Sequence, residues 1–323
     1  MKAIVYSRYG PPEVLRMEDV AKPTPKDDEV LIKLHAVSLN RSDWEGLTGK
    51  PLYARIGGLF NPTGRILGSD IAGVVEAAGK SHALFKPGDE VFGDIVGRQG
   101  AFAEYVCARG GTLALKPAGL TFEQAAALPQ AAVIALQGIQ DKGNIQPGQQ
   151  VLINGAGGGT GMFAIQLAKQ RGAEVTGVDN AEKQDFMRTQ GADHGIDYTR
   201  EDFTRSGKQY DFILDLVAYR SAFDYARALK PKGSYYVVGG SVGTLLNVLF
   251  LGPWIRRRTG KSVRVLMVQP NRKDLLESAD LIMTGKLKLH IDRRFPLSGV
   301  PDALRYLGEG HALGKIVITM ADD

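Results

Sequence analysis

Five glycines cluster between an apolar run and a helix-like segment in the stretch VLINGAGGGTG, residues 151–161. Glycines in such a loop let the backbone turn tightly and approach a phosphate, which the N–H groups of the following helix then bind. The spacing differs from a plain G-x-G-x-x-G, and a simple turn is the alternative. The strand pattern before the loop and the helix pattern after it favour a dinucleotide cofactor. The candidate cofactor-binding residues of this loop are Gly155, Ala156, Gly158, Gly159, Thr160 and Gly161.

An acidic residue ends the next predicted strand, EVTGVD, eighteen residues after Gly161. At that place Asp179 is expected to accept hydrogen bonds from the adenosine ribose, which favours NAD. Asn180, the next residue, is counted among the cofactor-binding candidates as well. The alternative is that Asp179 or Asn180 caps the following helix. Lys183 lies one turn further along, where a cation can meet the 2′-phosphate of NADP instead.

Two later strand ends supply further candidates for cofactor binding. Gly239, Gly240 and Ser241 follow the predicted strand SYYVV, and the carboxyl ends of parallel strands are where such sheets bind ligands. A flexible turn is the alternative for these three residues. Val217, after the predicted strand DFILD, is included in the same set.

The elements that position these residues follow two patterns of predicted secondary structure along the chain. The first 117 residues read as short strands separated by Gly and Pro, which indicates a small β-rich barrel or sandwich. A capping box over 121–124 then opens a helical run, and from residue 150 strands and helices alternate, which predicts a parallel sheet with helices on both faces. Residues 290–320, at the C-terminal end, again have the pattern of strands. We therefore predict a β-rich domain over 1–120, a nucleotide-binding domain over 121–262, and a last strand and helix followed by a return to the first domain over 263–323.

The composition argues against several classes of protein and site. The net charge of +5 is mild, and no aromatic-interleaved basic stripe stands out, so nucleic acid is not expected as a main partner. The single cysteine, Cys107, is expected in the core and excludes an internal disulfide or a zinc site built from several thiolates. The five histidines, at 35, 82, 194, 290 and 311, are scattered. The N-terminal text lacks the pattern of a secretion signal, so we expect a cytoplasmic protein.

Nearly the whole chain resembles one family in the order and spacing of its motifs. The matching text includes MKAIVYSRYGPPEVL, ILGSDIAGVV, FKPGDEVFG, QPGQQVLINGAGGGTG, ALKPKGSYYVVGG and GHALGKIVITM. These motifs resemble the medium-chain dehydrogenase/reductases, and more narrowly the zinc-free, zeta-crystallin-like quinone oxidoreductases. The resemblance implies a GroES-like catalytic domain, an inserted Rossmann domain and an active cleft between them. It also implies a homodimer formed by joining sheet edges, with VRVLMV as the edge strand.

The departures from the wider family concern the metal and the cofactor. Zinc relatives carry Cys where Asn40 stands and Gly-His-Glu where Gly68, Ser69 and Asp70 stand, so no zinc is expected. Relatives commonly have Thr in place of Ile134, near the nicotinamide. NADPH-using relatives have a small residue at the position of Asp179, but a Lys and a Tyr at those of Lys183 and Tyr198. The choice between NADP and NAD is left open.

Without a metal, easily reduced acceptors such as quinones and α,β-unsaturated carbonyls are the expected substrates. The resemblance makes Asn40 and Asp43 candidates for the cleft, because they occupy the loop that carries catalytic ligands in zinc relatives. Asn40 is expected to donate its amide N–H to the nicotinamide ribose or the substrate oxygen, and Asp43 to orient its neighbours. Tyr53 is expected to line the substrate pocket and donate its phenol. The alternatives are a turn role for Asn40 and loop packing for Tyr53.

Two other functions and one segment are left as alternatives. Reduction of enoyl thioesters would show as turnover of a CoA ester, and a catalytically weak RNA-binding relative would show as salt-sensitive RNA binding. The segment TLLNVLFLGPWIRRRTGKSVR, within 244–264, joins an apolar run to a basic cluster. It is too short to span a bilayer. The favoured interpretation is a packed helix or loop with its charges in water, and contact with an anionic membrane surface is the alternative.

Overall fold

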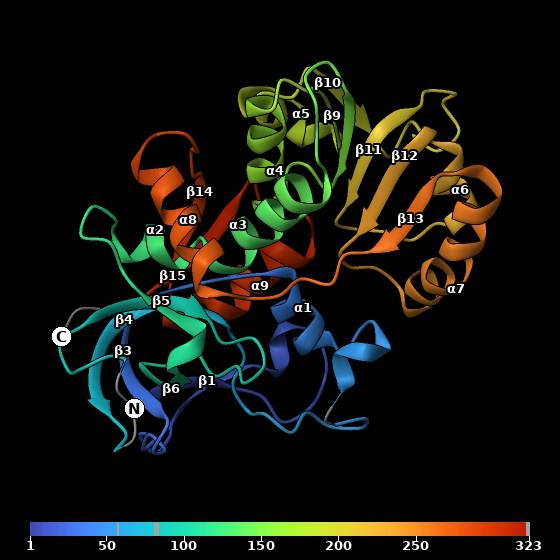
Figure 1. Ribbon diagram of the computed structural model, residues 1–323. Coiled ribbons are helices and arrows are strands. Elements are labelled where there is room, and N and C mark those ends of the chain that lie inside the picture. Colours follow the sequence, from blue (N-terminus) through green and yellow to red (C-terminus); the bar gives the residue numbers. More distant parts are fainter. Residues whose placement is uncertain (57, 81–83, 321–323) are drawn as a thin grey trace. The chain divides into compact units, whose positions relative to one another are not determined.

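The computed structural model describes residues 1–56, 58–80 and 84–320 of the chain (Figure 1). His82, one of the five histidines, lies outside these residues. The chain divides into two compact units, Met1–Val133 with Pro270–Asp323, and Ile134–Gln269. The first unit therefore extends beyond the predicted boundary at residue 120, and the second ends a few residues after the predicted 262. The first difference places residues 121–133 with the β-rich unit, and the second places residues 263–269 with the parallel sheet.

The first unit is built on a seven-stranded sheet in the order β14-β15-β3-β4-β5-β7, with β6 paired to β3, and on a two-stranded sheet of β1 and β2. The C-terminal tail supplies β14 and β15, and β15 runs antiparallel to β3. This return joins residues far apart in sequence. The strands are β1 (Lys2–Val5), β2 (Arg16–Asp19), β3 (Glu29–Ser38), β4 (Asp70–Ala78), β5 (Glu90–Asp94), β6 (Tyr105–Arg109), β7 (Leu113–Leu115), β14 (Ile291–Pro296) and β15 (Lys315–Thr319).

One predicted helical run is broken in the structure. Thr121 and Gln124 form the expected capping box, in which the Gln124 N–H donates to Thr121 Oγ1 at 3.1 Å. The helix they open ends at Ala126, because Pro129 lacks an N–H and starts a new helix instead. The helical elements of this unit are η1 (Pro12–Val14), α1 (Arg41–Thr48), η2 (Leu52–Arg55), η3 (Gly110–Thr112), α2 (Phe122–Ala126), α8 (Arg272–Met283), η6 (Leu297–Gly299) and α9 (Val300–Gly308). Helix α3 (Pro129–Ala135) crosses from this unit into the second.

The second unit is a six-stranded parallel sheet in the order β10-β9-β8-β11-β12-β13. The chain starts in the middle at β8, proceeds outward through β9 and β10, and then crosses to the other side of β8 to form β11. This is the doubly wound topology that the alternation predicts, although β10 has no counterpart among the predicted strands. The elements are η4 (Leu136–Lys142), β8 (Gln150–Asn154), α4 (Gly159–Gln170), β9 (Glu174–Asp179), η5 (Ala181–Lys183), α5 (Gln184–Thr189), β10 (His194–Asp197), β11 (Tyr210–Asp215), α6 (Ala222–Arg227), β12 (Leu229–Val237), α7 (Val242–Thr259) and β13 (Ser262–Val265).

Because the strands are parallel, their carboxyl ends lie along one edge of the sheet. Asn154 at the end of β8 is paired with Asp215 at the end of β11 and with Val178 of β9. The strand order reverses between β8 and β11, and ligands of such sheets bind outside the strand ends at this reversal. Among the helices of the described residues, none combines the length and apolarity needed to cross a bilayer.

Candidate functional site

The glycine loop between β8 and α4 depends on the absence of side chains. Gly155 has a φ of +84°, which favours glycine. A Cβ on Gly161 would lie 2.4 Å from the Gly155 oxygen and 2.5 Å from Ala156 Cα. These neighbours are backbone atoms and cannot move aside, so glycine at 161 is what lets α4 start against the loop.

The first turn of α4 is open to a ligand. Gly158 is the N-cap in an extended conformation, and no side chain caps the helix. The N–H groups of Gly159, Thr160 and Gly161 therefore have no acceptor within the helix. A Cβ on Gly158 would have its nearest neighbour at 3.6 Å, so the space in front of this residue is not filled by the protein. Free N–H groups, an open approach and the positive end of the helix dipole fit a pyrophosphate.

Asp179 braces the glycine loop from the end of β9. Its Oδ2 accepts from the Gly157 N–H at 2.9 Å, and its Oδ1 lies 3.5 Å from Lys183 Nζ. Both side chains are buried, so Asp179 is not a surface carboxylate that rotates freely. The Tyr198 N–H donates to the Asp179 carbonyl at 3.2 Å. Burial and the Asp179 charge raise the pKa of the half-exposed Tyr198 phenol. The structure thus brings these three predicted residues together, while the Asn180 side chain makes no capping bond.

The loops after β11 and β12 lie against each other. A Cβ on Gly155 would lie 3.5 Å from Val217 Cγ2, so Val217 borders the glycine loop. Ala218 and Gly240 form a parallel bridge, and a Cβ on Gly240 would lie 2.3 Å from the Ala218 oxygen. Gly239 accepts from the Ala218 N–H at 3.3 Å. Ser241 caps α7 by accepting from the Thr244 N–H at 3.0 Å, so its hydroxyl already has a structural partner.

A buried polar network under these loops was missed by the sequence analysis. Asp215 accepts from Asn154 Nδ2 and from the Tyr235 hydroxyl, each at 2.8 Å. Burial raises the pKa of Asp215 to about 6, and these hydrogen bonds oppose the rise. The sequence contains one indication of this network, because Asn154 and Asp215 are polar residues that each end an apolar strand.

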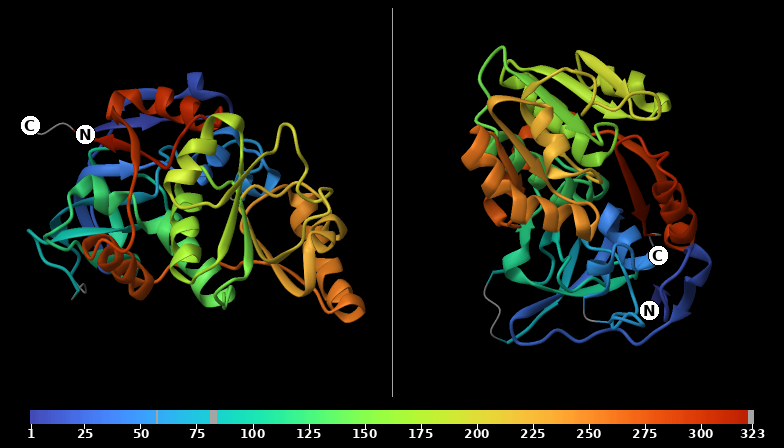
Figure 2. Two further views of the ribbon diagram at one scale, coloured as in Figure 1. Left: turned by 90° about the horizontal axis from the view of Figure 1, so that it is seen from above. Right: turned by 90° about the vertical axis from the view of Figure 1, so that its right-hand side faces the viewer.

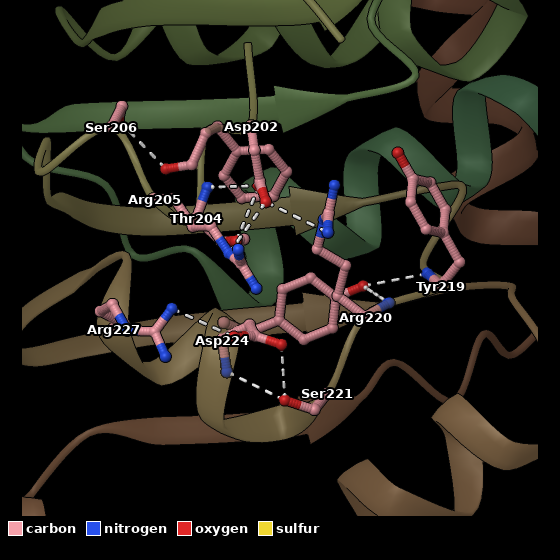
Figure 3. A network of polar contacts seen from close by, with 11 residues as sticks. Asp202, Thr204, Arg205, Ser206, Tyr219, Arg220, Ser221, Asp224 and Arg227 are labelled. Atoms are coloured by element: carbon pink, nitrogen blue, oxygen red, sulfur yellow. Dashed lines mark hydrogen bonds and ion pairs between the residues drawn. The ribbon is translucent and has the colours of Figure 1, made fainter. Parts of the chain in front are cut away.

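The loop after β11 also takes part in a network of polar contacts with the segment after β10 and with α6 (Figure 3). The Tyr225 hydroxyl accepts from the backbone N–H groups of Tyr219 and Arg220 at 3.0 and 2.9 Å. The Arg220 guanidinium reaches Asp202 at 3.1 Å, in the segment that follows β10. These contacts anchor Tyr219 and Arg220 in the loop that also carries Val217.

A second polar cluster lies in the first unit, around Asn40. The buried Lys315 Nζ, at the start of β15, donates to Asn40 Oδ1 at 2.6 Å and to the Leu39 carbonyl at 3.0 Å. An ammonium group only donates hydrogen bonds, so the oxygen of the Asn40 amide must face Lys315. The Asn40 Nδ2 is buried and has no partner within normal hydrogen-bond geometry in the described part of the chain. The Asn40 side chain nevertheless interacts with the Asp70 carboxyl and lowers its pKa, so a ligand that takes the Asn40 N–H groups competes with Asp70.

Three buried carboxyl groups surround this ammonium. Asp43 accepts from the Asn40 N–H at 2.8 Å, and Asp70 lies 3.8 Å from Lys315 Nζ. Burial raises the pKa of Asp43 to about 7, raises that of Asp70 and Asp94, and lowers that of Lys315. Asp43 Oδ1 and Asp70 Oδ1 have no partner within normal hydrogen-bond geometry. Sequence analysis missed Lys315, whose signal is a lysine that opens the apolar strand KIVIT.

Tyr53 lies in η2, apart from the Lys315 contacts. Its hydroxyl donates to Glu45 Oε2 at 3.1 Å, and burial raises the pKa of that carboxyl. Cys107 is buried, as predicted, and Ile134 lies in α3. Across residues 1–56, 58–80 and 84–320, no group of three or more His, Cys, Asp or Glu is arranged to hold a metal ion.

Comparison with known proteins now identifies the family. Residues 26–118 match the family described as alcohol dehydrogenase GroES-like domain, and residues 190–318 match that described as zinc-binding dehydrogenase. A 2-methylene-furan-3-one reductase of Solanum lycopersicum is 34% identical over 98% of this chain and 79% of the relative. The chain belongs to the zinc-free medium-chain dehydrogenase/reductases. The predicted family and fold class are thereby confirmed.

Two further proteins place this medium-chain reductase among its relatives. An NADPH-dependent alkenal/one oxidoreductase from the chloroplast of Arabidopsis thaliana is 32% identical over 98% of this chain and 79% of the relative. The solved quinone oxidoreductase of Coxiella burnetii is 33% identical, with a TM-score of 0.89 over 99% of each chain. The medium-chain reductase therefore shares its whole architecture with a protein named for quinone reduction.

Proposed function

We propose that this medium-chain reductase uses NADPH or NADH, without zinc, to reduce quinones or α,β-unsaturated carbonyls. The observation that carries the proposal is the open first turn of α4, where three backbone N–H groups and an unfilled approach at Gly158 fit a pyrophosphate. Relatives named for alkenal and quinone reduction support the substrate class.

Different residues around the glycine loop bind different parts of the cofactor. The loop and the start of α4 hold the pyrophosphate, and Asp179, Lys183 and Tyr198 meet the adenosine ribose with its hydroxyl or phosphate. Val217 and the 239–241 turn flank the loop. When bound, NAD(P)H supplies the hydride of the reaction.

Asn40 provides the polar contact in the first unit. Lys315 holds its amide oxygen, so Nδ2 donates to the nicotinamide ribose or to the substrate oxygen, where negative charge develops. Asp43 keeps the Asn40 backbone in place. Tyr53 lines the substrate pocket, with its phenol oriented by Glu45.

Two finer points belong to the same proposal. The carboxylate of Asp179 is paired with Lys183, so the pair does not exclude a 2′-phosphate, and both cofactors are accepted. We further propose a homodimer, because β13 ends the parallel sheet and leaves an unpaired backbone edge.

The test is steady-state turnover of each cofactor with a benzoquinone, a linear enone and crotonyl-CoA. We expect oxidation of NAD(P)H with the quinone or the enone, and a loss of roughly 10² in kcat/KM for Asn40→Ala, the size seen when one donor to a developing oxyanion is removed. Faster turnover of crotonyl-CoA would favour an enoyl-thioester reductase instead. Absence of turnover with all three acceptors would contradict the proposal.

A further inference from the structure

Helix α7 of the second unit presents an apolar stripe to solvent. Its inner face is packed down: Val248 and Ile255 are buried, and a Cβ on Gly252 would lie 2.2 Å from the Val263 oxygen of β13. The outer face carries large apolar side chains at spacings of three and four residues, which places them on one side of a helix. Their exposed fractions are 47% for Leu246, 59% for Leu249, 72% for Phe250 and 50% for Trp254.

The neighbouring helix α6 extends this stripe. Phe223 of α6 is 46% exposed and lies edge-on to Trp254, with ring centroids 5.8 Å apart. Figures 1 and 2 show α6 and α7 side by side at the β13 end of the parallel sheet. The side chains of Leu246, Leu249, Phe250, Trp254 and Phe223 are called the α7 face below.

The α7 face is continuous with a cationic end. Arg256, Arg257 and Arg258 are exposed in the last turn of α7, and the Arg258 guanidinium lies 5.7 Å from the Trp254 ring. Within the described residues, no carboxylate forms an ion pair with any of these three arginines. The sequence from 225 to 273 contains ten Lys and Arg and no Asp or Glu. A long acid-free segment is therefore combined with exposed aromatic and aliphatic side chains.

We propose that the α7 face docks on an anionic phospholipid bilayer, with α7 lying in the plane of the interface. Leu, Phe and Trp enter the boundary between headgroups and acyl chains, and the arginines bind lipid phosphates and carboxylates. A second copy of the chain is the less favoured occupant of this face, because α7 has no carboxylate to pair with the arginines of another α7, and the proposed homodimer uses the β13 edge instead. This inference is independent of the proposed reduction chemistry.

The experiment is co-sedimentation of the full chain with phosphatidylcholine vesicles, with and without phosphatidylserine, across a salt series. We expect binding to the anionic vesicles only, weakened by salt and by about fivefold for each arginine removed from the cluster. Phe250→Glu is expected to weaken binding at least tenfold. Leu276→Glu, on the exposed side of α8 in the other unit, is the matched control and is expected to bind like the wild type.

A second readout reports the depth of Trp254. The sequence has two tryptophans, Trp44 and Trp254. Anionic vesicles are expected to shift the emission to the blue, and brominated lipids to quench it, with both effects lost in Trp254→Phe. Circular dichroism and the thermal midpoint establish that each variant is folded.

Three outcomes would overturn the proposal. One is the absence of vesicle binding by the folded wild type. Another is a wild-type oligomer that Phe250→Glu dissociates, which would make a second copy the occupant. The third is equal vesicle binding by the wild type and Phe250→Glu, because binding would then not use the α7 face.

Discussion

At the scale of single residues, the buried ammonium of Lys315 orients the amide of Asn40. Lys315→Met removes the donor that holds Asn40 Oδ1, so the amide is free to rotate. We expect kcat/KM to fall by about 10–100-fold, as for the loss of one positioned hydrogen bond. If Lys315 acts through Asn40, the double variant Asn40→Ala/Lys315→Met loses no more activity than Asn40→Ala alone.

The measurement is a double-mutant cycle in kcat/KM, with thermal midpoints to separate folding from activity. Lys315→Arg, which keeps a cation and donors, is the conservative control and is expected to retain more activity than Lys315→Met. Additive losses in the cycle would contradict a role through Asn40.

Asp179 provides the residue-scale test of cofactor choice. Asp179→Asn keeps an oxygen that accepts from the Gly157 N–H but removes the negative charge beside Lys183. The freed cation is then expected to favour a 2′-phosphate, raising the preference for NADPH over NADH by about tenfold, or ~1.4 kcal/mol. The ratio of the two dissociation constants, measured by nicotinamide fluorescence, checks this. An unchanged ratio would place the adenosine ribose away from Asp179.

At the scale of elements, β13 carries the prediction of a dimer. The Leu266 N–H donates inward to the Val237 carbonyl at 2.7 Å, so the alternate N–H of Val265 faces the open edge. Val265→Pro removes this outward donor without breaking the pairing with β12. Light scattering after gel filtration is expected to show a dimer for the wild type and a monomer for the variant. A monomeric wild type would contradict the edge contact.

The elements show how far the sequence specifies this fold. Strand alternation, the capping box at Thr121 and the βα repeat were readable because each depends on local chemistry. The break before Pro129 was underestimated, although proline gives a local reason for it. The cofactor site could be predicted at the glycine loop, because only glycine fits the backbone conformation and close contacts found there. Lys315 could not be predicted, because its partners, Asn40 and Asp70, lie more than two hundred residues away in sequence and meet it only after the tail joins the sheet.

At the scale of the whole molecule, the buried carboxyls make stability depend on pH. Burial raises the pKa of Asp43 from its ordinary 3.8 to about 7, so the folded state prefers the protonated acid. Its contribution to the free energy of unfolding is full below pH ~4 and is lost as pH rises through about 7, a change of about 4 kcal/mol. Asp43→Asn is therefore expected to flatten the decline between these pH values.

Denaturant unfolding of the wild type and Asp43→Asn at several pH values checks this prediction. The two chains should differ most in slope between pH ~4 and ~7. Identical slopes would show that Asp43 titrates in the folded protein as it does in the unfolded chain.

The central claim is that the glycine loop is a phosphate cradle, and cofactor titration of Gly158→Ala beside the wild type tests it most directly. A Cβ at this position meets no protein atom closer than 3.6 Å, so the variant is expected to keep its thermal midpoint. It would nevertheless fill the approach to the α4 N–H groups, so NADPH and NADH should bind the wild type and bind the variant at least tenfold more weakly. A wild type that binds neither cofactor, or a variant that binds both equally well, would make the loop a simple turn and contradict the account.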